Sequence, residues 1–212
     1  MPLAKKAGFF SAEDYLEWEK GNEIKHEYLD GEVFPMYDAA QAMAGAKDGH
    51  VTVAGNIFAL LKSHLRGGPC RVYMADMKVR VEAANQFFYP DVVVTCDPSD
   101  RSADYFKSHP ALIVEVLSES TSAYDRGNKF EFYRQLDSLQ EYVLVDPDRF
   151  SVDCFRRDDS GHWVLYPSGA GETVEFASVD LRAPIAAFYE DVTFPEKPAG
   201  RVGAAQPDFR RN

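Results

Sequence analysis

The sequence has few cysteines and no long apolar run. Its three cysteines, Cys70, Cys96 and Cys154, are odd in number and widely spaced, which excludes a disulfide framework and a CxxC metal or redox motif. We therefore expect reduced, mostly buried thiols. No apolar run approaches the ~20 residues of a membrane helix, and residues 1–10 lack the apolar core of a signal peptide. These absences predict a cytoplasmic protein with no membrane partner.

Several signatures of enzyme sites are also missing. The chain has no GxSxG elbow, GxxxxGK phosphate loop, GxGxxG dinucleotide loop or HExxH zinc helix, and its five histidines lack the spacing of a metal cluster. Basic residues are in deficit, with 23 Lys and Arg against 34 Asp and Glu and a net charge of −11. Such a chain repels phosphate backbones unless positive charge is concentrated locally or a bound metal supplies it.

The length of 212 residues predicts one domain, since domains contain roughly 100–200 residues. We place it at residues 11–194, after an N-terminal extension of residues 1–10. Residues 195–212 carry proline, glycine and alanine with no apolar period, which predicts a disordered tail.

The first half of the chain predicts two helices and a hairpin. Ser11 is a capping residue for a helix that ends at Gly21, and Asp30-Gly31 suits the tight turn of a hairpin over residues 24–37. A longer helix is expected over residues 48–66. Its apolar residues recur at spacings of three and four, and they are Val51, Ala54, Phe58, Leu61 and Leu65.

The second half predicts a sheet. Residues 71–81 and 87–95 are β-rich and joined by a hairpin at Asn85-Gln86. Residues 111–117, 126–136 and 141–145 have the pattern of a strand, a crossover helix and a parallel strand. A hairpin over residues 151–166 is expected to close the domain. The elements together predict an α/β fold whose mixed central sheet is flanked by helices.

Two carboxylates stand in apolar strands, where an unpaired ionised acid is costly. Asp91 precedes three valines, and Glu115 lies between Leu112-Ile113-Val114 and Val116-Leu117. Mg²⁺ binds through one or two carboxylates plus substrate phosphate oxygens. Asp91 and Glu115 on neighbouring strands therefore predict a hard-cation site.

Lys129 is the expected cation of this site. It begins the crossover helix near the C-terminal end of the Glu115 strand, the edge at which open α/β sheets bind ligands. Asp125, Lys129 and Tyr133 are spaced by four and share one helix face. Two structural alternatives are open, because Lys129 can instead form an intrahelical pair with Asp125 or a buried ion pair with Glu115.

A set of short motifs resembles the Uma-type restriction-endonuclease family of the PD-(D/E)XK nuclease superfamily. The resemblance spans residues 11–189, and its motifs are specific as an ordered set and unspecific singly. It implies a restriction-endonuclease-like core and phosphodiester hydrolysis dependent on Mg²⁺ or Mn²⁺. The motifs are Glu27-Tyr28-Leu29-Asp30-Gly31-Glu32, Tyr89-Pro90-Asp91-Val92, Val114-Glu115-Val116-Leu117-Ser118 with Ser120-Thr121, Asp125 with Lys129 and Tyr133, and Glu141-Tyr142 with Val145-Asp146-Pro147.

The resemblance implies roles for five residues. Asp91 matches the aspartate of the PD motif and Glu115 the acid of the (D/E)XK motif, while Glu27 matches a further acid that would be an additional metal ligand. Leu117 replaces the lysine expected after the glutamate, and Lys129 is the candidate for a migrated lysine. His50 matches a family histidine that would contact a phosphate or assist water activation.

Structural alternatives stay open for two of these residues. Glu27 can be a solvated hairpin carboxylate, and His50 can cap the interface between helix and sheet. The basic groups of Lys62, Arg66 and Arg71, and of Arg126, Lys129 and Arg134, predict local basic surface or else ordinary solvated helix faces.

Three functions are compatible with these residues. The first is a DNA endonuclease, for which a homodimer would suit cleavage of both strands. The second is a nuclease-fold binding or assembly module without catalysis, since folds do not fix functions. The third is hydrolysis of RNA or a small phosphodiester, because a negative surface penalises long polyanions more than short ones.

Overall fold

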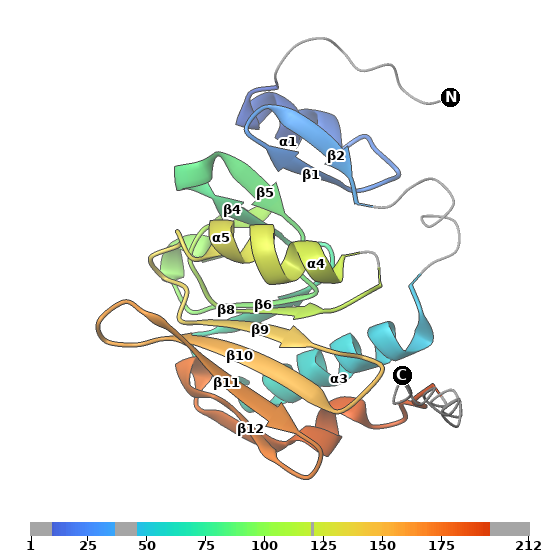
Figure 1. The fold of residues 1–212 in the computed structure, drawn as a ribbon. Coiled ribbons are helices and arrows are strands. Elements are labelled where there is room, and N and C mark those ends of the chain that lie inside the picture. Colours follow the sequence, from blue (N-terminus) through green and yellow to red (C-terminus); the bar gives the residue numbers. More distant parts are fainter. Residues whose placement is uncertain (1–9, 37–45, 120, 196–212) are drawn as a thin grey trace, which may run out of the picture.

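The computed structural model describes residues 10–36, 46–119 and 121–195 (Figure 1). Its two larger sheets have the strand orders β11-β10-β9-β8-β6-β3 and β2-β1-β5-β4-β7. Helices flank them, which confirms the expected α/β fold with a mixed central sheet. The expected extension of residues 1–10 lies outside the described residues except for Phe10, and the expected tail lies outside them except for residue 195.

The N-terminal elements follow the sequence pattern. Helix α1 (Ala12–Glu19) begins after Ser11, whose Oγ accepts a hydrogen bond from the Asp14 amide at 3.1 Å. Strands β1 (His26–Leu29) and β2 (Glu32–Pro35) pair antiparallel around Asp30 and Gly31, whose φ angles are 45° and 97°. The predicted helix and hairpin are confirmed.

Helix α3 (Asp48–His64) packs against the six-stranded sheet as expected, and its buried face agrees with the prediction in part. Ala54 and Leu61 are buried as predicted, but Val51 is 54% exposed, whereas Val53 and Ile57 are fully buried. Val53 and Ile57 are also compatible with the helical period. The sheet therefore decides the exact edge of the buried face.

Each of the two β-rich stretches divides between the sheets. Strands β3 (Arg71–Met74) and β6 (Val92–Thr95) pair antiparallel in the six-stranded sheet. Strands β4 (Lys78–Val81) and β5 (Gln86–Phe88) form the predicted hairpin in the five-stranded sheet, where β7 (Phe106–Lys107) joins β4 in parallel. The two stretches, β3–β4 and β5–β6, thus each run from one sheet to the other.

The predicted crossover is confirmed. Strands β8 (Pro110–Val116) and β9 (Glu141–Val145) pair in parallel. The connection contains α4 (Ser122–Tyr124), a π-helical turn (Asp125–Lys129) and α5 (Phe130–Tyr133). Such π-helical turns occur frequently at functional sites.

The hairpin of β10 (Ser151–Arg157) and β11 (Trp163–Gly169) does not close the domain, contrary to expectation. A third sheet of β12 (Thr173–Phe176) and β13 (Leu181–Pro184) follows, and then a 3₁₀ turn (Ile185–Tyr189). Phe176, Ile185 and Phe188 are buried in the same core as α3. This small sheet covers an apolar face that the first two sheets leave open.

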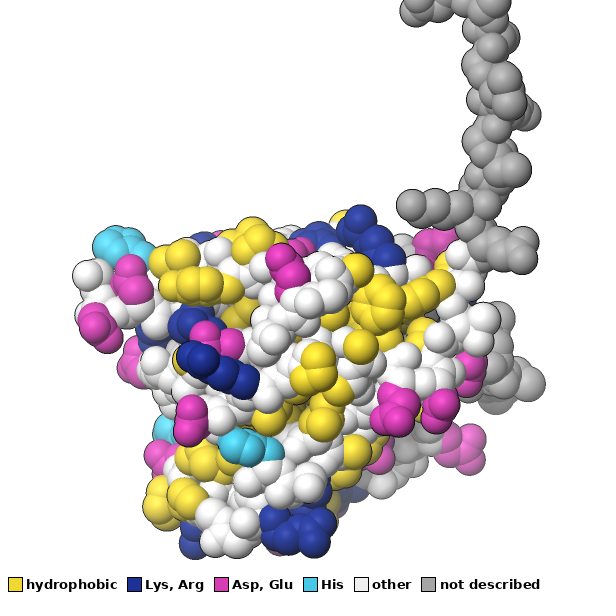
Figure 2. Space-filling model, turned by 90° about the horizontal axis from the view of Figure 1, so that it is seen from below, with side chains coloured by type: hydrophobic (Ala, Val, Ile, Leu, Met, Phe, Trp, Pro, Cys, Tyr) yellow, Lys and Arg dark blue, Asp and Glu magenta, His cyan; other side chains and the backbone are white. Residues whose placement is uncertain are grey.

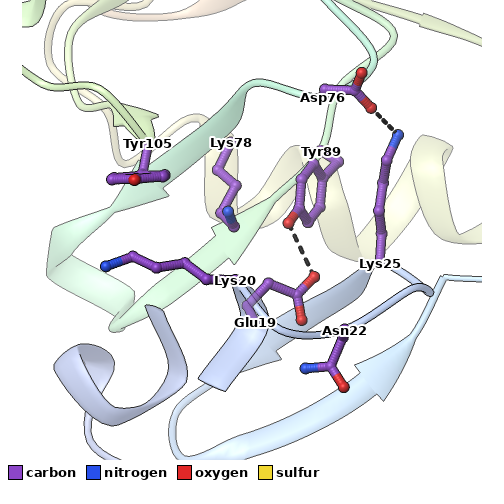
Figure 3. Close-up of a pocket in the computed structure, with 8 residues that line it drawn as sticks. All are labelled: Glu19, Lys20, Asn22, Lys25, Asp76, Lys78, Tyr89 and Tyr105. Carbon is purple, nitrogen blue, oxygen red and sulfur yellow. Dashed lines mark hydrogen bonds and ion pairs between the residues drawn. The ribbon is translucent and has the colours of Figure 1, made fainter. Parts of the chain in front are cut away.

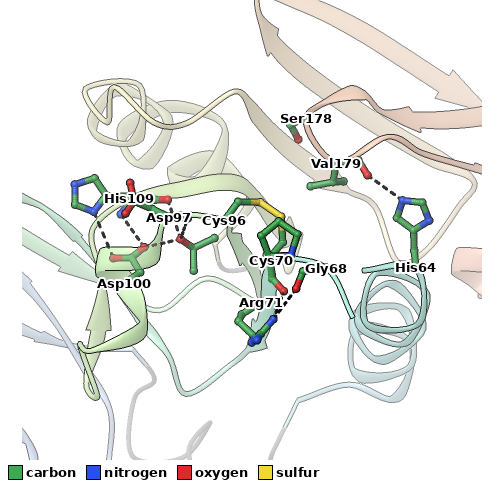
Figure 4. Close-up of a disulfide and its surroundings, with 12 residues drawn as sticks. His64, Gly68, Cys70, Arg71, Cys96, Asp97, Asp100, His109, Ser178 and Val179 are labelled. Carbon is green, nitrogen blue, oxygen red and sulfur yellow. Dashed lines mark hydrogen bonds and ion pairs between the residues drawn. A yellow bond between two sulfur atoms is a disulfide. The ribbon is translucent and has the colours of Figure 1, made fainter. Parts of the chain in front are cut away.

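Cys70 and Cys96 form a disulfide (Figure 4), so the expectation of reduced thiols is wrong for this pair. Arg71 pairs with Thr95 across β3 and β6, which places Cys70 directly opposite Cys96 one residue beyond the strand ends. The pairing register, which cysteine spacing does not reveal, brings the thiols together. Cys154 is a buried free thiol, as expected.

We expect reduction of this disulfide to lower the free energy of unfolding by roughly 2–4 kcal/mol, because the crosslink restricts the unfolded chain. Urea unfolding of the wild type with and without dithiothreitol measures the change. The double variant Cys70→Ser/Cys96→Ser is the control, since its midpoint should not respond to dithiothreitol. A wild-type midpoint that is equally unresponsive would contradict the prediction.

No helix in the described part of the chain is long and apolar enough to cross a bilayer.

Candidate active site

Asp91 and Glu115 meet at one end of the six-stranded sheet. Val92 of β6 pairs with Val114 of β8, so Asp91 stands opposite Glu115 one residue further along. The Asp91 amide lies 3.4 Å from Glu115 Oε2, and the Val116 amide donates to Asp91 Oδ2 at 2.7 Å. The prediction that the two acids lie on neighbouring strands is confirmed.

Glu115 is almost fully buried, with 3% of its surface exposed. Its Oε1 lies 3.2 Å from Lys129 Nζ and accepts a hydrogen bond from the Tyr133 hydroxyl at 3.3 Å. Burial, reinforced by the nearby acids Asp125 and Asp91, raises its pKa well above the usual range despite the attraction to Lys129. Ionisation of Glu115 is therefore unfavourable unless a further cation is present.

Lys129 is the centre of the acidic cluster, which we define as Glu27, Asp91, Glu115 and Asp125. Its Nζ lies 3.2 Å from Glu27 Oε1, 3.2 Å from Glu115 Oε1 and 3.4 Å from Asp125 Oδ1. Burial lowers the pKa of Lys129, but the charges of Glu115 and Glu27 outweigh burial and raise it. Both structural alternatives for Lys129 are therefore present at once, because the ammonium contacts Asp125 and Glu115 together.

Glu27 reaches the cluster from β1 in the five-stranded sheet. The residue is buried, so the alternative of a solvated hairpin carboxylate is wrong. Burial raises its pKa, although its contact with Lys129 acts in the opposite direction. Two separate sheets and the crossover segment thus supply the acids around one ammonium.

His50 lies in the first turn of α3, with its Nε2 3.4 Å from Asp91 Oδ2. Burial lowers its pKa, but the hydrogen bond to Asp91 and the charge of that acid raise it overall. His50 does stand between helix and sheet, as its structural alternative required. Its ring also faces a carboxylate of the cluster, which places it beside the candidate site.

The cluster carries more acid than base. Three of its four carboxylates share Lys129, the fourth, Asp91, pairs with His50, and the buried Asp125 Oδ1 accepts no hydrogen bond among the described residues. Carboxylate oxygens are the ligands that Mg²⁺ and Mn²⁺ prefer. In the ranges that the structure describes, no three His, Cys, Asp or Glu side chains form a complete metal-binding group. The donor set thus fits a hard cation held by two carboxylates and by substrate oxygens.

A protein family comparison decides the affiliation of the chain. Residues 12–183 match the family Uma2, described as "Putative restriction endonuclease". The chain belongs to the Uma2 family. This confirms the resemblance drawn from the short motifs and supports a nuclease function in general terms.

Two relatives of this Uma2 chain come from Synechocystis sp. The uncharacterized protein slr1290 is 36% identical over 184 residues, which cover 87% of this chain and 93% of the relative. The uncharacterized protein sll1609 is 30% identical over 185 residues, which cover 85% of this chain and all of the relative. Similarity therefore extends over nearly the whole length of both relatives.

A solved structure shares the fold. The crystal structure of a "putative nuclease belonging to DUF820" from Anabaena variabilis superposes with a TM-score of 0.65 over 85% of this chain and 98% of that one. The two are 14% identical, so the likeness shows the fold alone. The nuclease-like core expected of an Uma2 protein is thereby confirmed.

Two tyrosines beside the acidic cluster of this Uma2 chain were given no role from the sequence. The Tyr142 hydroxyl donates to the Asp125 carbonyl at 2.9 Å, and the Tyr133 hydroxyl contacts Glu115. Burial and the charge of Glu115 raise the pKa of both phenols, which therefore stay protonated as donors. The four-residue spacing already placed Tyr133 on the face of Lys129. Tyr142, in a continuous apolar strand, gave no comparable signal.

Of the basic residues named from the sequence, Lys129 lies in the acidic cluster, whereas several others have different surroundings. Lys62 and Arg66 line a cavity with Arg71 at the C-terminal end of α3, whereas His50 lies at its N-terminal end. Arg126 forms an ion pair with Asp153 at 2.8 Å. On the face seen in Figure 2, basic side chains lie in separate groups between apolar and acidic ones.

Proposed function

We propose that this chain is a metal-dependent endonuclease that hydrolyses phosphodiester bonds in DNA. The observation that carries the proposal is the convergence of Asp91 and Glu115 at one sheet end, beside a lysine shared by three carboxylates. A cluster with this excess of acid is an electrostatic liability to a folded protein in the absence of a cation. A divalent cation that takes part in hydrolysis would balance this excess of negative charge.

Asp91 and Glu115 are the residues proposed to hold Mg²⁺ or Mn²⁺, with Glu27 as an additional ligand. When bound, such an ion polarises a phosphate oxygen and lowers the pKa of its water. Val116 and the Asp91 amide fix the two carboxylates through their hydrogen bonds. The protein thus holds these oxygens in place before substrate arrives.

Lys129 is proposed to orient the attacking water and to offset the negative charge that develops on the phosphate. It takes the place of the lysine that Leu117 replaces in the strand. Its Nζ is already within 3.2 Å of Glu115. His50 is proposed to contact a phosphate oxygen with its protonated ring, which Asp91 favours, or, when the ring is neutral, to take a proton from water.

Residues 11–194 are proposed as the catalytic domain. One cluster cuts one strand, so we propose that two copies of the chain associate to cut both strands of a duplex.

The test is cleavage of supercoiled plasmid at low salt in Mg²⁺, in Mn²⁺ and in EDTA. We expect nicked or linear product with either metal and none in EDTA, because Asp91 and Glu115 alone do not activate water. Asp91→Asn prepared identically should lose the activity while it remains folded. Equal cleavage by wild type and variant would contradict the assignment.

Two other outcomes select the alternatives. Cleavage of RNA or of a small phosphodiester but not of plasmid would favour the shorter substrates. A folded wild type that binds nucleic acid, cleaves nothing and shows no thermal shift with Mg²⁺ or Mn²⁺ would favour the non-catalytic module.

A further inference from the structure

A cavity of about 380 Å³ lies beside α1 at one end of the five-stranded sheet (Figure 3). Its volume is within the roughly 300–1,000 Å³ of small-molecule sites. Lys78 lines it, while the next residue, Val79, is buried in the opposite core with Tyr133. Because successive strand residues face opposite sides, the cavity and Lys129 lie on opposite faces of this sheet.

Lys78 is the unusual residue of the cavity. Only 8% of its surface is exposed, and its Nζ lies 5.0 Å from the centre of the Tyr89 ring. Figure 3 shows the amine directed into the cavity between Tyr89 and Tyr105. Within the described residues, Lys78 forms no ion pair, and burial lowers its pKa. The charge of Glu19 acts on Lys78 from a distance, and a bound anion would supply a counter-charge in direct contact.

The other charged side chains of the cavity already have partners. Glu19 accepts hydrogen bonds from the His26 amide at 2.8 Å and from the Tyr89 hydroxyl at 2.9 Å. Lys25 pairs with Asp76, and Lys20 pairs with Glu17 at 2.6 Å. The charge of Glu19 attracts the Lys78 ammonium without an ion-pair contact in the described residues. The cavity lining holds three lysines against two acids, so it favours a ligand with an anionic group.

An aromatic surface stands at the mouth of the cavity. Tyr105 is 54% exposed, and Lys20 Nζ lies 4.8 Å from the centre of its ring. Its neighbour Phe106 pairs with Lys78 across β7 and β4, so the ring and the buried ammonium lie close together. An exposed ring beside a cation suits a ligand with a flat base and a phosphate.

The chain connects this cavity to the acidic cluster. Tyr89 lines the cavity and stands two residues before Asp91. His26, whose amide donates to Glu19, directly precedes Glu27. The Ala75 amide donates to the Asp91 carbonyl, and the next residue, Asp76, lines the cavity. A polynucleotide strand that passes over this end of the sheet can therefore reach both sites.

We propose that the cavity is a subsite for one unstacked nucleotide of the strand being cut, with its phosphate on Lys78 and its base on Tyr105. The proposal rests on the proposed nuclease function. It assigns the cavity a positioning task, because a nucleotide held there fixes the course of the strand toward the acidic cluster.

The test is binding of a fluorescein-labelled oligothymidylate in EDTA, followed by anisotropy over a range of salt concentrations. We expect Lys78→Met to weaken binding about tenfold and to reduce the salt slope by about 0.7, the value of one single-strand phosphate contact. Tyr105→Ser should weaken binding about tenfold through lost stacking and leave the slope unchanged. Arg182→Gln, which removes one positive charge on the distant β12–β13 sheet (Figure 1), should change affinity less than twofold.

Each other outcome overturns the subsite. These are no binding by wild type, equal losses in Arg182→Gln and the cavity variants, or competition by inorganic phosphate as effective as that by thymidine 5′-monophosphate. Should Lys78→Met fail to fold, the exposed Tyr105→Ser still decides the matter. Plasmid cleavage lost in Asp91→Asn with unaltered oligothymidylate binding in the cavity variants would reject the subsite alone. Cleavage retained in Asp91→Asn, with weaker oligothymidylate binding by the cavity variants, would instead reject the proposed metal site and leave the cavity as a nucleotide-binding site.

Discussion

Glu115→Gln is expected to reduce metal-dependent plasmid cleavage by about a hundred- to a thousandfold while the protein becomes more stable in EDTA at pH 8. The loss follows from removal of one proposed metal ligand and of charge stabilisation at the phosphate. The gain follows because glutamine imitates the protonated carboxyl, which burial favours at this position. If Glu115 only stabilised the fold, the Glu115→Gln protein would instead be less stable than the wild type.

The sign of the stability change follows from proton linkage. The pKa of Glu115 is raised in the folded state, so the folded protein binds more protons than the unfolded chain above pH ~4.3, the ordinary value for glutamate. Stability from the protonated carboxyl is present below that pH and is lost as the pH rises toward the folded-state pKa. The difference between variant and wild type should therefore grow from pH 5 to pH 8.

Urea unfolding at both pH values and thermal shifts with Mg²⁺ measure this prediction. Mg²⁺ should raise the melting temperature of the wild type and leave that of Glu115→Gln unchanged, since only the wild type retains the site. Glu131→Gln, on the exposed side of α5, is the matched control. A Glu115→Gln protein that is less stable than this control at pH 8 would show that Glu115 is a structural partner of Lys129.

Lys129→Met is expected to lower the free energy of unfolding by about 3–5 kcal/mol at pH 7, the cost of leaving buried charges unpaired. Glu27 and Glu115 would then lose the ammonium that lies 3.2 Å from each. The cost should fall at pH 5, because the raised pKa of both acids lets them take up protons. Cleavage should be lost as well.

Lys47→Met is the matched control for this variant. Its ammonium is largely exposed and lies 3.7 Å from Glu119, and exposed pairs contribute little. Urea unfolding of both variants at pH 5 and pH 7 gives the comparison. Equal stability of Lys129→Met and Lys47→Met at pH 7 would mean that the cluster does not depend on its lysine.

The sequence alone was sufficient for the centre of the candidate site. Glu115 was recognisable because an acid in a continuous apolar strand requires a partner, and the crossover placed Lys129 at the end of that strand. These inferences use local patterns and the one geometry common to parallel strands. They hold because the strand, the helix and the next strand are consecutive in the chain.

Other features depend on contacts between distant segments and were not predictable. The Cys70–Cys96 disulfide follows from the register of β3 and β6, and the burial of Val53 rather than Val51 on α3 follows from the sheet beneath the helix. Lys78 in an alternating strand has the pattern of an exposed residue, yet α1 and Tyr89 cover it. Predicting these features requires knowledge of how the two sheets are placed relative to each other.

The origin of Glu27 in a different sheet from Asp91 and Glu115 has a consequence for folding. Lys129 acquires its full set of partners only when the N-terminal hairpin docks against the crossover segment. A chain whose first hairpin has not yet packed therefore holds an incomplete site. Under the proposed function, activity would therefore require contact between the first hairpin and the crossover segment, and not the six-stranded sheet alone.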